Sequence, residues 1–126
     1  MEYINTDRAP RPIGPYSQAI VVDKLIFVSG QLPINPITGE IIKNNFKDAV
    51  KQTLMNIIEI VRAANGDINT IIKTTIYLKD ISRFNEFNEV YSEIFKNHKP
   101  TRVIIGVSSI PRDADIMIEA IALKNL

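Results

Sequence analysis

The sequence predicts an α+β fold in which two helices pack on one face of a sheet, with the element order β-β-α-β-α-β-β. Several short segments are rich in β-branched and aromatic residues or alternate in polarity, as strands do. Two longer segments instead repeat apolar residues at the spacing of a helix. The 126 residues suit a single domain, so we expect residues 1–126 to form one.

The first strands are predicted to form a hairpin. Residues 24–33 carry a β-branched and aromatic run that stops at Ser29-Gly30. Residues 18–23 form the partner strand, with Asp23-Lys24 at the turn. The preceding residues, with Pro10, Pro12 and Pro15, are expected to be an extended lead-in.

The first helix is predicted from Phe46 to Ala64, with one buried face. Asn44 or Asn45 can cap its start, and Asn65-Gly66 is typical of a helix end. Residues 71–79 then return to the two-residue period of a strand and should place on one face Ile72, Thr74, Ile76 and Leu78.

A second helix is predicted from about Ser82 to Phe95, and two strands, 102–107 and 116–123, complete the chain. The inner side of this helix should carry Phe84, Phe87, Tyr91 and Ile94.

Composition excludes several classes of function. The 15 basic and 14 acidic residues are intermixed, without the basic block of a nucleic-acid or membrane surface. Cysteine is absent, which removes disulfides, thiol catalysis and thiolate metal sites. No apolar run approaches the ~18 residues of a membrane span, and the N-terminus does not resemble a signal peptide. We therefore expect a soluble cytoplasmic protein.

Two charged residues interrupt apolar strands. Arg102 begins the run Val103-Ile104-Ile105, and Glu119 lies in a strand that is apolar on both faces. A hairpin centred between residues 110 and 111 would place Arg102 opposite Glu119, although a one-residue slip would put them on opposite faces. Two interpretations stay open. The residues form a structural ion pair, or Arg102 binds the carboxylate of a ligand while Glu119 transfers protons.

Three further places are candidates for the same pocket. Tyr16 follows a Gly-Pro turn, Ser29-Gly30 leaves backbone groups accessible at a strand end, and Asn88 lies on the inner stripe of the second helix. Each also has an ordinary structural interpretation. His98, the only histidine, lies among loop residues and is expected to be solvated rather than catalytic. No metal-ligand spacing and no nucleotide-binding motif occurs.

The segments IGPYSQA, IFVSGQLPINPITGE, YLKDISRFNEFNEVYSEIF, KPTRV and IMIEAIAL resemble, in order and spacing, the RidA/YjgF family of reactive intermediate deaminases, which includes the endoribonuclease L-PSP type. The resemblance covers nearly the whole chain. It implies a chorismate-mutase-like fold, assembled as a homotrimeric barrel with pockets between subunits. It also implies hydrolysis of 2-aminoacrylate-type and 2-aminocrotonate-type enamines and imines to 2-keto acids and ammonia, without metal or cofactor.

The family's functional residues match positions already singled out. Arg102 matches its carboxylate-binding arginine, Glu119 its water-positioning acid, and Tyr16 its pocket tyrosine. Ser29-Gly30 matches the strand-end backbone and Asn88 the helix asparagine. The resemblance therefore predicts Glu119, Arg102 and Tyr16 as catalytic and Arg102, Ser29, Gly30 and Asn88 as substrate-binding, in a 2-iminobutanoate/2-iminopropanoate deaminase.

The chain departs from the common family sequence after Arg102. A cysteine, a glutamate and an arginine of many members are replaced here by Ile104, Gly106 and Ser109, which puts substrate size preference in doubt. A second hypothesis is a non-catalytic sensor of a 2-keto acid or amino acid, but a sensor needs only Arg102, so the retention of Glu119 favours the enzyme. Neutral charge and the lone loop histidine disfavour an RNA-cleaving role, and neither nucleic acid nor a membrane is an expected partner.

Overall fold

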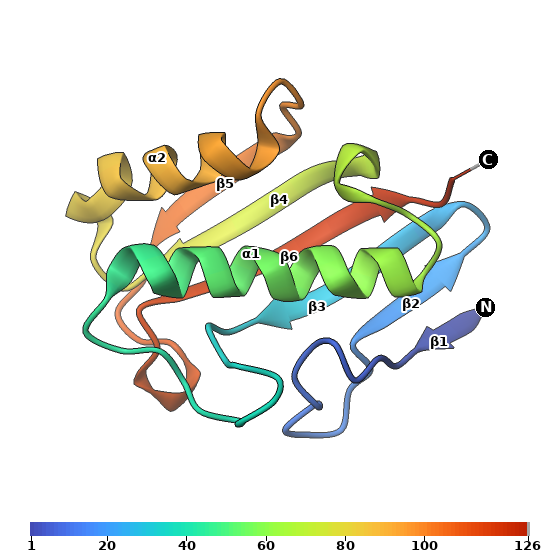
Figure 1. The fold of residues 1–126 in the computed structure, drawn as a ribbon, viewed down its shortest axis with the longest axis horizontal. Helices are drawn as coiled ribbons and strands as arrows, with labels where there is room; N and C mark the ends of the chain where they lie inside the picture. The colour runs from blue at the N-terminus through green and yellow to red at the C-terminus, as the bar shows by residue number, and fades with distance from the viewer. Residues whose placement is uncertain (126) are drawn as a thin grey trace.

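The computed structural model describes residues 1–125 and contains a six-stranded sheet with α1 and α2 over the same face (Figure 1). The strands lie in the order β1-β2-β3-β6-β4-β5, with β4 and β5 parallel and the other neighbours antiparallel. The predicted α+β class is confirmed. The strands are β1 Glu2–Ile4, β2 Ala19–Val22, β3 Leu25–Gln31, β4 Ile71–Leu78, β5 Thr101–Gly106 and β6 Ile116–Leu123.

Helix α1, Phe46–Ala63, forms where the helical spacing predicted it. The side chain of Asn45 caps its start by accepting a hydrogen bond from the backbone N–H of Asp48 at 3.1 Å. The chain turns away at Gly66, where an added Cβ would lie 2.8 Å from the carbonyl oxygen of Leu123. A glycine is therefore required for α1 to end this close to β6.

Helix α2, Phe84–Phe95, begins after a 3₁₀ turn at Ile81–Arg83. The predicted start near Ser82 is early, because Asp80 caps the turn by accepting a hydrogen bond from the Ser82 N–H at 3.0 Å. The inner face also differs from the prediction, since Phe84 is 39% exposed and Ile94 only partly buried. The buried side chains of α2 are Phe87, Val90, Tyr91 and Phe95.

The hydrophobic core lies between the sheet and the two helices (Figure 1). The alternation predicted for β4 holds from Thr74 onward. A break in register between Ile71 and Lys73 reverses it at the start of the strand, so that Ile71 is fully buried and Ile72 is 38% exposed. The isoleucines and alanines of β6 that face the helices fill the centre of this core.

The N-terminal lead-in contains a strand that the sequence analysis did not predict. Residues Glu2–Ile4 pair with β2 along the edge of the sheet. Three residues are too few to show a two-residue period among polar neighbours, so this strand had no distinct pattern. The hairpin of β2 and β3 is confirmed, with Val22 opposite Leu25 and Asp23 in the left-handed conformation at the turn.

The hairpin of β5 and β6 that would place Arg102 opposite Glu119 does not form. Strand β6 lies between β3 and β4, and β5 pairs in parallel with the outer edge of β4. Helix α2 connects β4 to β5, and a helical crossover of this kind is how parallel neighbours are joined. Arg102 is in register with Thr74, whereas Glu119 is in register with Thr75. The two side chains therefore leave opposite faces of the sheet.

Among the described residues, no helix has the length and apolar character needed to cross a bilayer.

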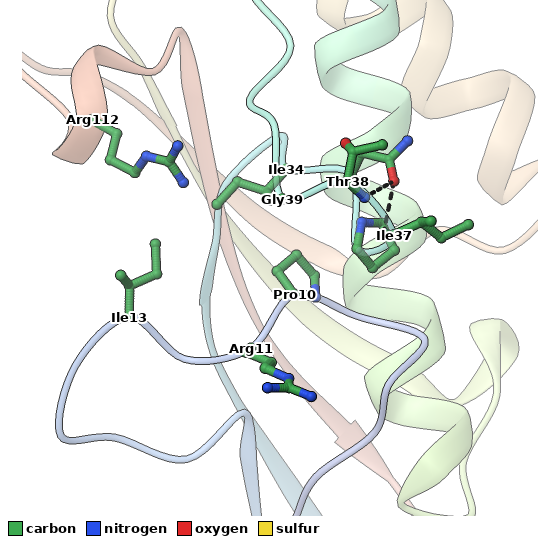
Figure 2. A pocket seen from close by; sticks show the side chains of 10 residues that line it. Pro10, Arg11, Ile13, Ile34, Ile37, Thr38, Gly39 and Arg112 are labelled. Carbon is green, nitrogen blue, oxygen red and sulfur yellow. Dashed lines mark hydrogen bonds between the residues drawn. The ribbon is translucent and has the colours of Figure 1, made fainter.

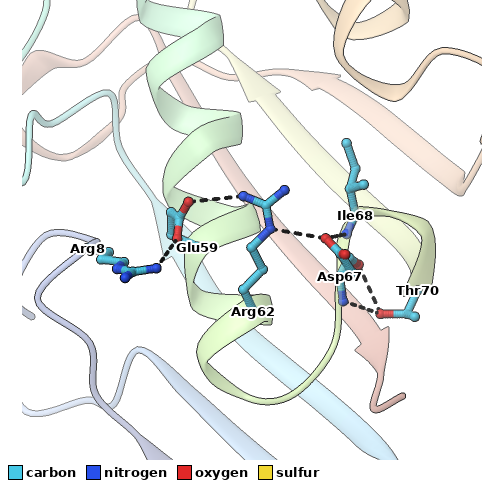
Figure 3. A network of polar contacts seen from close by, with 6 residues as sticks. All are labelled: Arg8, Glu59, Arg62, Asp67, Ile68 and Thr70. Atoms are coloured by element: carbon cyan, nitrogen blue, oxygen red, sulfur yellow. Dashed lines mark hydrogen bonds and ion pairs between the residues drawn. The ribbon is translucent and has the colours of Figure 1, made fainter. Parts of the chain in front are cut away.

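A polar network ties the lead-in to the end of α1 (Figure 3). Glu59 accepts a hydrogen bond from Arg62 at 3.2 Å and lies 4.0 Å from Arg8 of the lead-in. Arg62 also donates to Asp67 at 3.1 Å, and the Asp67 carboxylate accepts the backbone N–H of Ile68 at 2.8 Å. The network thus fixes the turn between α1 and β4.

We expect Asp67→Ala to destabilise the fold by about 1 kcal/mol at neutral pH, the usual worth of an N-cap. The backbone N–H of Ile68 and then Arg62 lower the pKa of Asp67 below its ordinary 3.8. The carboxylate therefore contributes stability above pH 3.8, and this contribution is lost as the pH falls below that value. Urea unfolding at several pH values should show the difference from wild type shrinking in acid. An equal difference at every pH would contradict this, and Asp7→Ala is the control for removal of an exposed acid.

Candidate functional site

Four of the predicted site residues line one hollow on the sheet face that the helices do not cover. The hollow measures ≈ 610 Å³ and is called the candidate pocket below. Strands β3 and β6 form its floor, and the lead-in and the connection before β6 form its walls. It is lined by Ile13, Tyr16, Ser29, Gly30, Leu32, Pro111, Arg112, Met117 and Glu119.

Ser29 and Gly30 form a break in the pairing of β3 with β6. Val28 pairs with Ala120 and Gln31 with Ile118, so two residues of β3 lie opposite the single residue Glu119. Such a bulge removes backbone groups from the ladder and re-aims the neighbouring side chains. The predicted strand end at Ser29-Gly30 is therefore a bulge within a strand that continues to Gln31.

The surroundings of the bulge require a small residue at position 30 and use the hydrogen bonds of Ser29. A Cβ on Gly30 would lie 3.0 Å from the sulfur of Met117, so any larger residue would require that side chain to shift. The Ser29 hydroxyl donates to the carbonyl of Ser17 at 2.6 Å, and its N–H donates to the carbonyl of Gln18 at 2.9 Å. The bulge is thereby joined to the segment that carries Tyr16.

Glu119 lies exposed on β6 with Tyr77 of β4 beside it. The Tyr77 hydroxyl donates to a Glu119 oxygen at 3.5 Å, and partial burial together with the Glu119 charge raises the pKa of Tyr77. Tyr77 therefore stays protonated at neutral pH and can orient the carboxylate. Sequence reasoning missed Tyr77 as a site residue. The two-residue period of residues 71–79 already placed its side chain on the face of the strand that is not buried.

Tyr16 lies at the mouth of the candidate pocket with 46% of its surface exposed. Its hydroxyl accepts the backbone N–H of Ile13 at 3.3 Å, and its own N–H donates to the carbonyl of Gly14 at 2.9 Å. These bonds fold residues 13–16 into a tight turn over the pocket.

Buried Gln18 anchors the segment that carries this turn. Its side-chain nitrogen donates to the carbonyls of Thr6 at 3.0 Å and Pro10 at 2.9 Å, and its oxygen accepts the N–H of Thr6 at 2.7 Å. The side chain is only 2% exposed, so backbone groups freed by its loss would have little water to bind.

We expect Gln18→Ala to lower the free energy of unfolding by about 2–4 kcal/mol and to loosen the lead-in, because several partly buried polar groups lose their partners together. Chemical denaturation measures the first effect and limited proteolysis of the lead-in the second. Gln52→Ala is the matched control, since among residues 1–125 Gln52 makes one side-chain hydrogen bond, to Asn56 at 2.8 Å. Equal, small effects of both changes would contradict the anchoring role.

Arg102 does not reach the candidate pocket of its own chain. It lies half-buried under α2, with its guanidinium carbon 5.1 Å from the ring centre of Tyr91, 5.8 Å from Phe84 and 5.9 Å from Phe87. Stacking on aromatic rings holds the cation in place. Within residues 1–125 no carboxylate lies within 4.0 Å of it. The hypothesis of an ion pair between Arg102 and Glu119 is therefore wrong for a single chain.

Asn88 lies with Arg102 rather than with Glu119. It is half-buried on α2, three and four residues from Tyr91 and Phe84, which are its neighbours on the helix surface. The predicted site residues thus form two groups. Tyr16, Ser29, Gly30 and Glu119 lie on the open face, while Arg102 lies on β5 under α2 and Asn88 lies on α2 itself.

His98 is more enclosed than the sequence analysis expected. It is half-buried, with Nε2 2.6 Å from the carbonyl oxygen of Ile71. The three departures from the common family sequence lie on or just after β5. Ile104 packs against the core, Gly106 ends the strand and Ser109 is exposed in the following connection. None of the three lines the candidate pocket.

The uncovered sheet face also carries a broad apolar surface. Large side chains there are between 37% and 44% exposed, which is unusual for so many neighbours on one sheet. They are Val22, Leu25, Phe27, Val103, Ile105 and Leu123.

Comparison with known proteins establishes the family. The sequence profile of the endoribonuclease L-PSP family matches residues 6–124. A RutC family protein of Pyrococcus horikoshii is 52% identical over 124 residues, 98% of each chain. The human protein named 2-iminobutanoate/2-iminopropanoate deaminase is 41% identical over 122 residues, 97% of this chain and 89% of that one. The chain belongs to the endoribonuclease L-PSP family, the RidA/YjgF family that its motifs resemble.

A solved structure supports the same conclusion. TdcF of E. coli, solved with bound serine, superposes with a TM-score of 0.95 at 39% identity, covering 99% of this chain and 100% of the other.

Proposed function

We propose that the protein hydrolyses short 2-imino acids, the tautomers of 2-aminoacrylate and 2-aminocrotonate, to 2-keto acids and ammonia. The observation that carries the proposal is the placement of Glu119 opposite the Ser29-Gly30 bulge, in a hollow that Tyr16 also lines. The human, mouse and bovine relatives at 40–41% identity are named for this activity, and serine, bound in TdcF, is itself a small amino acid.

In this mechanism Glu119 holds a water molecule against the imine carbon. The water oxygen bonds to that carbon while its proton passes to the carboxylate. Glu119 returns the proton to nitrogen, the C–N bond breaks, and the new hydroxyl becomes the carbonyl of the keto acid. The imine nitrogen enters the step protonated, as an iminium, so it carries three protons when the C–N bond breaks, and the hydroxyl proton then converts the released ammonia to ammonium. Tyr77 keeps the carboxylate oriented through both transfers.

The substrate carboxylate is bound in this proposal by Arg102 of a second copy of the chain. Arg102 has no acidic partner among the described residues, and in its own chain the sheet separates it from Glu119. The apolar side chains of the uncovered face need a cover, and another sheet of the same kind supplies one. We propose a homotrimer in which each candidate pocket faces the β5 edge and α2, including Asn88, of a neighbour.

A coupled assay tests the activity. Threonine dehydratase releases the enamine in a non-nucleophilic buffer, and the appearance of 2-oxobutanoate is followed with and without the protein. Acceleration of this step supports the deaminase. Ligand binding without acceleration would instead support a non-catalytic sensor of a 2-keto acid or amino acid. The observation that favours a sensor is the separation of Arg102 from Glu119 within one chain.

A further inference from the structure

A second hollow adjoins the candidate pocket and shares a wall with it. This outer hollow measures ≈ 430 Å³ and lies between the lead-in and the loop at residues 34–39. Ile13 and Arg112 line both hollows. Figure 2 shows Arg112 on one side of the outer hollow and Arg11 on the other, with Pro10, Ile13 and Ile34 between them.

The charge of the two hollows is unequal. Glu119 and Arg112 are the charged residues that line the candidate pocket. The outer hollow is lined by two arginines and, among the described residues, by no carboxylate. Neither Arg11 nor Arg112 has an acidic group of residues 1–125 within 4.0 Å. An anion that enters from the candidate pocket would therefore meet positive charge as it extends outward.

The backbone that carries Arg112 is held in an uncommon conformation. Arg112 has φ 59° and ψ 21°, and Asp113 follows with φ 56°, both in the left-handed region that residues other than glycine rarely adopt. The Asp113 N–H donates to the carbonyl of Ile110 at 3.0 Å, and its carboxylate pairs with Lys79. Strain maintained by such contacts is typical of functional positions. Here these contacts fix the backbone of Arg112, whose exposed side chain lies at the junction of the two hollows.

We propose that Arg112 determines substrate specificity by binding a second carboxylate, at the end of the substrate's side chain. The preferred substrates would then include 2-imino dicarboxylic acids of four or five carbons. Arg102 of the second copy binds the carboxylate next to the imine, and Glu119 holds the water against the imine carbon. The substrate's side chain then extends to Arg112, whose planar guanidinium can bind the second carboxylate through two hydrogen bonds. This inference rests on the proposed deaminase function.

The test compares two substrates that differ in the second carboxylate. Threonine dehydratase supplies 2-iminobutanoate, and oxidation of aspartate by an amino-acid oxidase supplies 2-iminosuccinate. We measure kcat/KM for both with wild type, Arg112→Ala, Arg112→Lys and the control Arg8→Ala, which removes an exposed arginine that lines neither hollow. Arg112→Ala should lower the ratio of kcat/KM for the dicarboxylate to that for the monocarboxylate by about tenfold or more, mainly through KM.

Arg112→Lys should keep part of the preference, because it retains the charge without the fork, and Arg8→Ala should leave the ratio unchanged. An unchanged ratio in Arg112→Ala, or no turnover of 2-iminosuccinate by an enzyme active on 2-iminobutanoate, would overturn the inference while the deaminase stands. Calorimetric titration with oxaloacetate and 2-oxobutanoate separates the two failures. If neither imine is hydrolysed faster, the deaminase fails, and weaker binding of oxaloacetate alone by Arg112→Ala still supports the role of Arg112.

Discussion

Glu119→Gln is expected to lower kcat for imine hydrolysis by about 10²–10⁴-fold, the usual worth of a general acid–base group. Glutamine keeps the size of the side chain and can still accept the Tyr77 hydrogen bond. It cannot take a proton from water or return one to nitrogen. The loss should therefore appear in kcat rather than in KM, because the substrate carboxylate is bound elsewhere.

The fold should tolerate this change, because Glu119 is exposed and its contact with Tyr77 is long, at 3.5 Å. Thermal unfolding of Glu119→Gln should match wild type, and Glu40→Gln, in the exposed loop before α1, is the control for loss of a surface charge. A variant that unfolds readily would show that Glu119 is structural. If the variant kept its activity, another group would have to transfer the proton, and Tyr77 would be the first to examine.

The elements predicted best are those whose own residues determine them. Helix α1 carries a full apolar stripe, a capping asparagine and a glycine that ends it, so pattern, start and stop agree. The hairpin at Asp23-Lys24 is likewise determined by residues that are close together in the sequence. The predicted start of α2 was early, because Asp80 caps a 3₁₀ turn and Ser82 precedes the helix itself. Caps of the two kinds look alike in sequence.

The strand order could not be predicted in the same way. Strands β5 and β6 are consecutive, and both read as apolar, so a hairpin was the simplest pairing. The sheet instead inserts β6 between β3 and β4, a choice made by contacts between segments distant in sequence. The candidate residues were nevertheless recognisable individually, because Arg102 and Glu119 both interrupt apolar strands. Their relation to each other required the register, which places them on opposite faces of the sheet.

Complementation between two inactive variants follows from this separation and is the second large effect that we expect. Arg102→Ala loses the carboxylate-binding site and Glu119→Gln loses the proton carrier, so each homotrimer should be inactive in the coupled assay. Arg102→Ala removes aromatic stacking worth about 0.5–2 kcal/mol, which should leave the protein folded and assembled. Co-expression with two different tags, followed by purification on both, isolates trimers that contain both variants.

In every such mixed trimer, one pocket pairs an intact Arg102 from one copy with an intact Glu119 from its neighbour. The mixed trimers should therefore show about one third of wild-type activity, as cyclic threefold symmetry requires. A chain that carries both substitutions, mixed with the Arg102→Ala chain, is the matched control, and its trimers should remain inactive because no copy then supplies Arg102. Mixed trimers of the two single variants that also remain inactive would show that one copy contributes both residues. Because the sheet of a single chain separates Arg102 from Glu119, that result would require the β5 edge to rearrange before the substrate binds.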